Sequence, residues 1–107
     1  MESDDSEIEI PTSNTIFSIS ARFNIMLLLY VHKKISFTEM QKLLGLTSGN
    51  LNHHLNKLIE NNYVDTKKMI FSKRPINMIF ITEKGKNKFS EYLQKFKEIL
   101  ESIEKID

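Results

Sequence analysis

A stretch of small hydrogen-bonding side chains in the middle of the chain carries the clearest chemistry in this sequence. It supplies hydroxyl, carboxamide, imidazole and ammonium groups at Ser48, Asn50, Asn52, His53, Asn56 and Lys57. Between them Leu51, Leu55 and Leu58 recur at helical spacing, which predicts a helix with one buried face. The opposite face would then present donors and acceptors to base edges and phosphate oxygens. This pattern predicts a helix that reads the major groove of double-stranded DNA.

Three histidines, three glycines and no cysteine leave little material for catalysis or metal binding. The adjacent pair His53-His54 is the one candidate metal site, but neighbours on a helix point about 100° apart, whereas paired ligands prefer i, i+4 spacing. The sequence has no nucleophile constellation and no Gly-rich phosphate loop. We therefore expect no enzyme activity, no metal and no cofactor. We expect His53 to face outward and His54, at the edge of the apolar face, to be a structural, hydrogen-bonded residue.

The residues before this helix predict a second short helix that would position it. Ser36 and Glu39 form a capping-box pattern, and the helix that they begin would run to Leu44. Gly45 suits a left-handed C-cap, and Thr47 can cap the helix that follows. Two short helices joined by a tight turn that contains Gly are the helix-turn-helix arrangement.

Further along the chain the hydrophobic pattern becomes that of strands. Residues 63–71 and 76–81 are rich in Val, Ile, Phe and Tyr, and a turn-forming segment at residues 72–75 separates them. This predicts a β-hairpin with the cations Lys73 and Arg74 at its tip. We expect these cations to contact phosphate or the minor groove, and a solvated turn without a partner is the alternative. A helix-turn-helix followed by such a hairpin is a winged helix.

Two segments have the pattern of self-association. Residues 16–32 are apolar around most of a helix circumference, which indicates burial on more than one side. A last helix, beginning at residues 82–85, repeats apolar residues at alternating steps of four and three, as in a short coiled coil. We predict a two-fold dimer through these helices; the alternative is that the last helix packs back on its own domain. The predicted interface residues are Ile19, Phe23, Phe89, Leu93, Phe96, Leu100 and Ile103.

Taken together, these motifs resemble the winged-helix transcriptional regulators of the ArsR/MarR-like group, and most of all the small stand-alone type common in archaea and bacteria. The resemblance covers roughly residues 16–106. Its most specific parts are Gly-Asn-Leu-x-His-His-Leu at residues 49–55 and Thr-Glu-Lys-Gly at residues 82–85. The resemblance implies a homodimer that binds operator DNA, with the third helix in the major groove and the wing near the minor groove. Small members of the group often have no known small-molecule effector.

The predicted fold class is mainly α with a small β-hairpin (α+β), a winged helix-turn-helix with a long C-terminal dimerisation helix. We divide the chain into an acidic, disordered tail at residues 1–12, a winged-helix DNA-binding domain at 13–82 and a dimerisation helix at 83–107. A chain of 107 residues with 40% hydrophobic content suffices for one modest core. Its apolar runs fall short of the roughly 18 residues that a membrane span needs, and it begins with no signal pattern. We expect a cytoplasmic protein.

The net charge of +1 hides an asymmetry along the chain. Residues 1–9 carry five acids and no cation, residues 10–90 carry a net +8, and residues 91–107 carry a net −2. The basic middle part is the electrostatic footprint expected of a nucleic-acid-binding domain. The acidic start either aids solubility alone or competes with DNA phosphates and so weakens non-specific binding.

Three functions are compatible with these features. The leading hypothesis is a sequence-specific transcriptional regulator, a repressor by analogy alone. The second is an architectural protein that coats DNA with little sequence preference, and the third is a winged helix used as a protein–protein interaction module. A protein-binding helix usually exposes aromatic or apolar anchors. The polar helix and the basic hairpin tip therefore argue against the third hypothesis.

Overall fold

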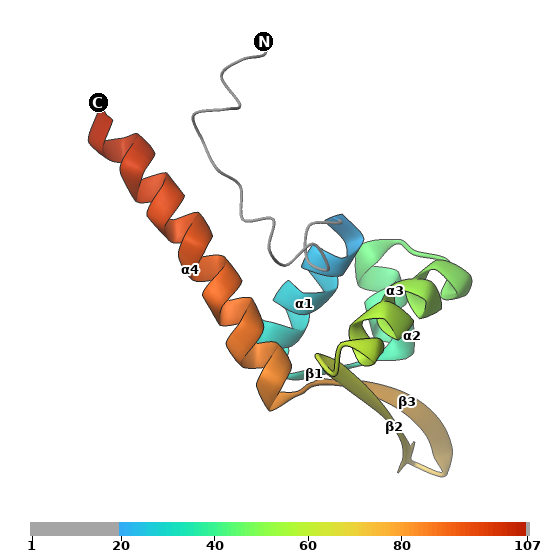
Figure 1. Cartoon of the computed structure of the whole chain (residues 1–107). Helices are drawn as coiled ribbons and strands as arrows, with labels where there is room; N and C mark the ends of the chain where they lie inside the picture. The colour runs from blue at the N-terminus through green and yellow to red at the C-terminus, as the bar shows by residue number, and fades with distance from the viewer. Residues whose placement is uncertain (1–19, 107) are drawn as a thin grey trace.

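The computed structural model describes residues 20–106, which form four helices and three strands. In chain order these are α1 (Ser20–His32), β1 (Lys34–Ser36), α2 (Phe37–Leu44), α3 (Ser48–Glu60), β2 (Val64–Phe71), β3 (Arg74–Ile81) and α4 (Glu83–Ile106). Figure 1 shows the long helix α4 beside α1, the α2–α3 pair on the other side of α1, and the β2–β3 hairpin projecting from the helical part. The predicted winged helix-turn-helix, mainly α with a small β component, is confirmed. The predicted acidic tail and the start of the predicted first helix, with Ile19, lie outside the described residues.

The helix-turn-helix pair is held by the capping residues that predicted it. The Ser36 hydroxyl oxygen accepts a hydrogen bond from the Glu39 N–H at 3.1 Å, and the Thr47 hydroxyl oxygen accepts one from the Asn50 N–H at 3.1 Å. Each of these N–H groups lies in the first turn of a helix, where it has no partner within the helix. Gly45 ends α2 with a φ of 64°, a left-handed conformation that glycine adopts without strain. Both ends of the turn between α2 and α3 are therefore fixed.

The sheet has one strand more than the sequence predicted. β1 pairs antiparallel with β3, which in turn pairs with β2, so the strand order is β1-β3-β2. In this register Ile35 of β1 lies opposite Ile79 of β3, and both are buried. The short strand thus joins the start of the helix-turn-helix to the base of the hairpin.

The hairpin turn is shorter than predicted. It consists of Ser72 and Lys73, with φ values of 50° and 65°, the two-residue geometry that matches the twist of the strands. Arg74 and Pro75 were expected in the turn, but they are the first residues of β3. Proline is tolerated there because β1 pairs only with residues 78–80, so Pro75 lies where β3 has an unpaired edge.

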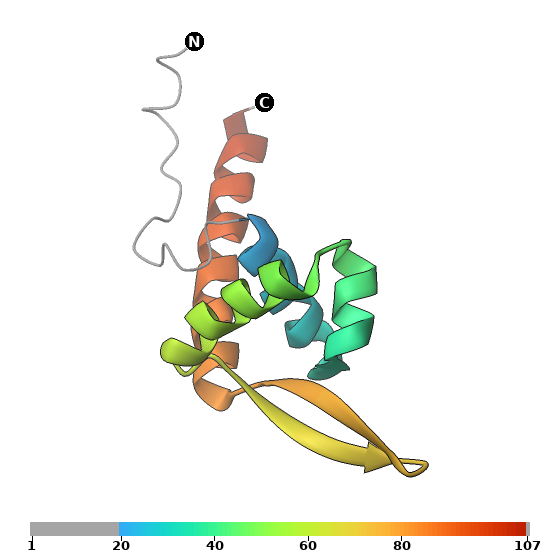
Figure 2. The same ribbon diagram turned by 90° about the vertical axis from the view of Figure 1, so that its right-hand side faces the viewer.

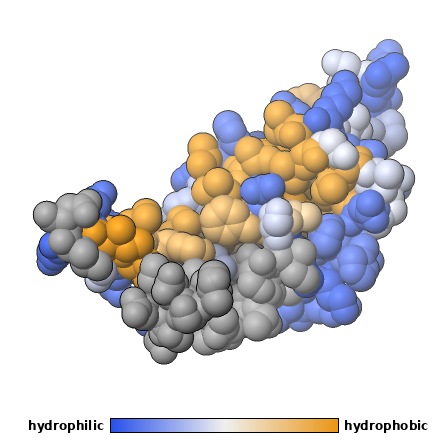
Figure 3. Space-filling view, turned by 90° about the horizontal axis from the view of Figure 1, so that it is seen from above, coloured by the Kyte–Doolittle hydropathy of each residue, from blue (hydrophilic) through white to orange (hydrophobic). Residues whose placement is uncertain are grey.

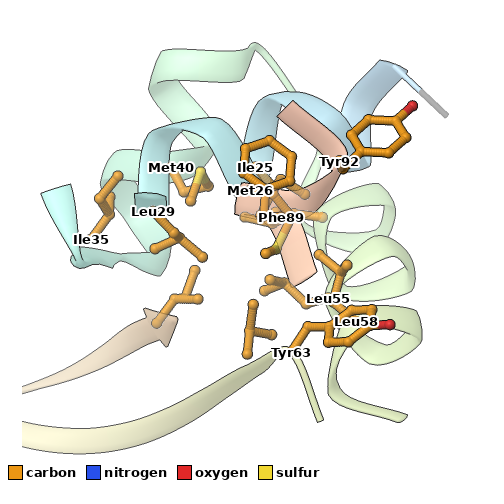
Figure 4. Close-up of a cluster of buried hydrophobic side chains, with 13 residues drawn as sticks. Ile25, Met26, Leu29, Ile35, Met40, Leu55, Leu58, Tyr63, Phe89 and Tyr92 are labelled. Carbon is orange, nitrogen blue, oxygen red and sulfur yellow. The ribbon is translucent and has the colours of Figure 1, made fainter. Parts of the chain in front are cut away.

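A single hydrophobic core lies beneath α3, between α1, the sheet and the start of α4 (Figure 4). The three leucines predicted to be buried, Leu51, Leu55 and Leu58, are at most 2% exposed. They pack with residues from α1 and α4 in one cluster, which includes Ile25, Met26, Leu29, Phe89 and Tyr92. The predicted apolar face of α3 is therefore the part of the helix that anchors it to the domain.

The start of α4 is fastened to the start of β2 by a residue of the Thr-Glu-Lys-Gly motif. The Thr82 hydroxyl lies 2.7 Å from the carbonyl oxygen of Asn62 and 3.0 Å from that of Tyr63, and it accepts a hydrogen bond from the Gly85 N–H at 2.9 Å. A Cβ atom on Gly85 would lie 2.8 Å from the carbonyl carbon of Tyr63 and 2.9 Å from its Cα, closer than atoms pack. Glycine is needed at this position because the two backbones approach so closely.

Candidate nucleic-acid interface

The polar face of α3 is open to solvent. All six α3 residues predicted to contact DNA are exposed: Ser48, Asn50, Asn52, His53, Asn56 and Lys57. The same helix buries its leucines in the core, and its sole acid, Glu60, is its last residue. The helix therefore presents a row of hydrogen-bonding groups of little net charge on a rigidly held backbone.

The two adjacent histidines differ in their surroundings. His53 is exposed, as predicted, whereas His54 is half-buried. The pKa of His54 is lowered below its ordinary value of 6.5. The largest cause is burial, followed by the charge of Arg22 and then by that of His53. Within residues 20–106 the buried Nδ1 of His54 has no hydrogen-bond partner, so the predicted hydrogen bond is absent at that atom. Residues 20–106 also contain no group of three His, Cys, Asp or Glu side chains able to hold a metal ion.

The charged side chains along the outer part of the β2–β3 hairpin, which we call the wing, are all basic. Lys73 and Arg74 are exposed at the tip as predicted, and Lys67 and Lys68 are exposed on β2. The sequence has no Asp or Glu between residues 66 and 82, so the one acid of the wing, Asp65, lies at its base, away from the cations at the tip. A surface of this kind attracts a polyanion along its length.

The wing is joined to the end of α3 by a short, hydrogen-bonded connection. The Tyr63 N–H donates to the carbonyl oxygen of Leu58 at 3.0 Å, and the Asn61 side-chain amide donates to that of Lys57 at 2.8 Å. Asn62 takes a left-handed conformation with a φ of 63°, which reverses the chain into β2. Figure 2 shows the hairpin leaving the C-terminal end of α3 and extending away from the helices. The structure thus brings the polar face of α3 and the basic wing into one domain.

The predicted dimerisation residues within the described part of the chain fall into three groups. Phe89 is fully buried, with its ring centroid 5.6 Å from that of Phe23, so it belongs to the core of its own domain. Its prediction as an interface residue is corrected, because no part of it is open to a partner. Phe23, Leu93 and Phe96 are half-buried against the same cluster, whereas Leu100 and Ile103 are 59% and 41% exposed.

A hollow that the sequence did not predict lies where β3 meets the start of α4. It has a volume of about 320 Å³, and its lining includes Lys33, Lys34 and Lys86, with Tyr30 and Glu83. No pattern in the sequence indicates it, because Lys86 is about fifty residues from the other two lysines and the strand that aligns them, β1, was not predicted.

Helix α4 is long but strongly charged. Among residues 20–106 no helix, α4 included, is both long and apolar enough to cross a membrane. Its charges include Lys88 and Glu91, whose side chains lie 3.9 Å apart on the surface.

Residues 21–100 match the family of winged helix DNA-binding domains. This chain belongs to that family. An uncharacterized protein from Methanocaldococcus jannaschii is 38% identical to it over 89 residues, which cover 83% of this chain and 97% of the relative. A solved structure of a transcriptional regulator homologue from Pyrococcus horikoshii OT3 has 32% identity and a TM-score of 0.80, and the match covers 86% of this chain and 91% of that one.

The same winged-helix architecture occurs in more distant regulators. A MarR variant from E. coli, solved in complex with operator DNA, has 20% identity and a TM-score of 0.58, over 73% of this chain and 53% of that one. At this level of identity the likeness shows a shared fold. In winged-helix terms α3 is the second helix of the helix-turn-helix, and β2–β3 is the wing.

Proposed function

We propose that this winged-helix protein is a transcriptional regulator that binds double-stranded DNA through α3 and the wing. The observation that carries the proposal is the division of α3 into a buried leucine face and an exposed face of six hydrogen-bonding residues. A helix held in this way and lined with amides suits the major groove, where bases must be read as well as phosphates held. Membership of a DNA-binding family and the likeness to a transcriptional regulator homologue support it.

The proposed contacts differ in kind along the interface. Asn50 and Asn52 are assigned to base edges, because a carboxamide can pair with adenine through two hydrogen bonds. Ser48 is assigned to a phosphate, since it lies in the first turn of α3, where free N–H groups favour anions. Lys73 and Arg74 are assigned to phosphates beside the minor groove. Repression, as opposed to activation, is proposed by analogy alone.

A homodimer is part of the proposal. The C-terminal half of α4 leaves Leu100 and Ile103 exposed, and Figure 3 shows apolar side chains gathered in a band across one face of the molecule. At 24 residues α4 is about 36 Å long, longer than the contacts at its first half require. A two-fold dimer through α4 would place two copies of α3 about 34 Å apart, one turn of DNA, and would demand a pseudo-palindromic site.

The role of the wing can be tested with Arg74→Ala. If Arg74 neutralises a phosphate, this variant binds every duplex more weakly, and the slope of log K against log salt falls by about 0.9 for each phosphate that is no longer neutralised. Lys97→Ala, at an exposed position of α4, is the matched control for removal of one cation and should leave both quantities unchanged. Wild-type affinity for Arg74→Ala would remove the wing from the mechanism, and failure of the wild-type protein to bind any duplex would contradict the function itself.

A further inference from the structure

Two large apolar side chains are exposed at the tip of the wing. Ile70 and Phe71, the last two residues of β2, are 74% and 53% exposed. Ile70 is the most exposed of the large hydrophobic residues in the described part of the chain. The core does not extend to this end of the hairpin, so neither side chain packs in it. Both side chains are therefore available for contact with another molecule.

The two side chains lie on opposite faces of the hairpin, because successive residues of a strand point to opposite sides. In the register of the sheet Ile70 is opposite Pro75, and Phe71 is opposite Arg74. One face of the tip is therefore aliphatic, and the other pairs an aromatic ring with a guanidinium group. Any molecule that receives the tip must accept apolar contact and positive charge together.

The charge around the tip identifies the class of partner. Lys68, Lys73 and Arg74 surround the apolar pair, and there is no acid between residues 66 and 82. A second copy of this tip would be repelled by the same charges, whereas a polyanion would be attracted. In duplex DNA the phosphates border the minor groove, and the apolar faces of the deoxyribose rings lie between them. This alternation matches the cations and the apolar side chains of the tip.

We propose that Ile70 and Phe71 contact the deoxyribose walls at the mouth of the minor groove, and so add an apolar, salt-independent component to DNA binding beside Lys73 and Arg74. The inference rests on the proposed function and specifies how the wing meets its ligand. Contact occurs at the mouth, because the minor groove is about 6 Å wide and a sheet with side chains on both faces is thicker, about 10 Å.

The absence of tryptophan from the chain allows a direct test. Phe71→Trp gives a protein with one tryptophan at the tip, and Val31→Trp gives one at a 63% exposed position of α1. Acrylamide quenching of each is measured with and without a labelled duplex of about three helical turns, whose anisotropy in the same sample reports whether it is bound. We expect bound duplex to reduce quenching of Phe71→Trp at least twofold and to leave Val31→Trp unchanged. Equal quenching of Phe71→Trp in samples where the anisotropy shows binding would overturn the inference while leaving the proposed function intact.

Alanine variants test the energetic part of the inference. Phe71→Ala and Ile70→Ala should each weaken binding to the duplex about five- to tenfold, the effect of removing roughly 50 Å² of buried apolar surface, with the salt slope of the wild-type protein. Val31→Ala is the control for truncation of an exposed apolar residue and should bind like the wild type. Unchanged affinity in both tip variants, or a fall in slope equal to that of Arg74→Ala, would contradict an apolar contact.

Discussion

The side chains of α3 separate the stability of this domain from its proposed recognition of DNA. Leu51, Leu55 and Leu58 are buried, and truncating such residues to alanine costs about 2–5 kcal/mol. The exposed residues on the polar face, such as Asn50 and Asn52, can be replaced with little effect on folding. Substitutions on the polar face therefore report on binding alone.

Asn50→Ala and Asn52→Ala should reduce discrimination between DNA sequences more than they reduce affinity for random DNA. A carboxamide that pairs with a base through two hydrogen bonds contributes roughly 1–3 kcal/mol of specificity, which disappears on truncation. The measurement is the ratio of dissociation constants for the preferred and the scrambled duplex, with each variant compared to the wild type. If neither substitution changes this ratio, base reading by these two residues is excluded.

His54 should make the stability of the domain depend on pH. Its pKa is lowered in the folded state below 6.5, chiefly by burial and next by Arg22. Below pH 6.5 the unfolded state therefore binds more protons at His54 than the folded state does. The contribution of His54 to the free energy of unfolding is complete above pH 6.5 and is lost as the pH falls through the folded pKa. Thermal unfolding followed by circular dichroism should give a lower Tm at acidic pH, with a smaller decrease in His54→Gln. The same dependence in both proteins would show that other groups cause it.

At the scale of elements, local signals predicted the helices well and the sheet incompletely. The caps at Ser36 and Thr47 and the left-handed Gly45 are specified by neighbouring residues, so the sequence predicts them. The three residues of β1 are too few to show a strand period, and they become a strand because β3 lies beside them. Pro75 suggested a longer turn, since the sequence does not reveal that its edge of β3 is unpaired.

The candidate site shows the same limit. The exposed face of α3 follows from helical spacing alone, and the basic tip follows from its composition. The core position of Phe89 could not be predicted from the sequence. A 4-3 repeat identifies residues that share a helix face, but it does not show whether that face packs on its own domain or on a partner. Exposure of Ile70 and Phe71 could not be inferred either, since a run of apolar residues at the end of a strand does not show how far the core extends along the hairpin.

The junction between α4 and β2 should depend on glycine. In Gly85→Ala the new Cβ would overlap the Tyr63 carbonyl group, and these backbone atoms cannot move without shifting β2 or α4. We expect a decrease of about 1–3 kcal/mol in the free energy of unfolding in urea, as for other overpacked sites. Gly49→Ala is the control, because its Cβ would meet no atom within 4 Å and alanine favours the helix. Equal stability of the two variants would contradict this account of the junction.

At the scale of the whole molecule, the proposed regulator needs two copies of α3 held in register. Leu100 is 59% exposed on α4, so replacing it should not disturb the monomer. Leu100→Glu would place a charge in the proposed dimer interface, and light scattering coupled to size-exclusion chromatography should then give the monomer mass. Ser102→Glu introduces the same charge at a neighbouring exposed position outside the apolar repeat and should remain dimeric. A wild-type protein that is monomeric at micromolar concentration would rule out the stable dimer.

The central claim is that this winged helix distinguishes one DNA sequence from another. Fluorescence anisotropy with a duplex from the region upstream of its own coding sequence and a scrambled duplex of equal length, at low and at physiological salt, tests it most directly. The proposal predicts a preference of about a thousandfold or more that persists at physiological salt. Equal and steeply salt-dependent binding to both duplexes would contradict specific regulation from that region and favour an architectural role. No binding to either duplex would favour the hypothesis that the winged helix is a protein-interaction module.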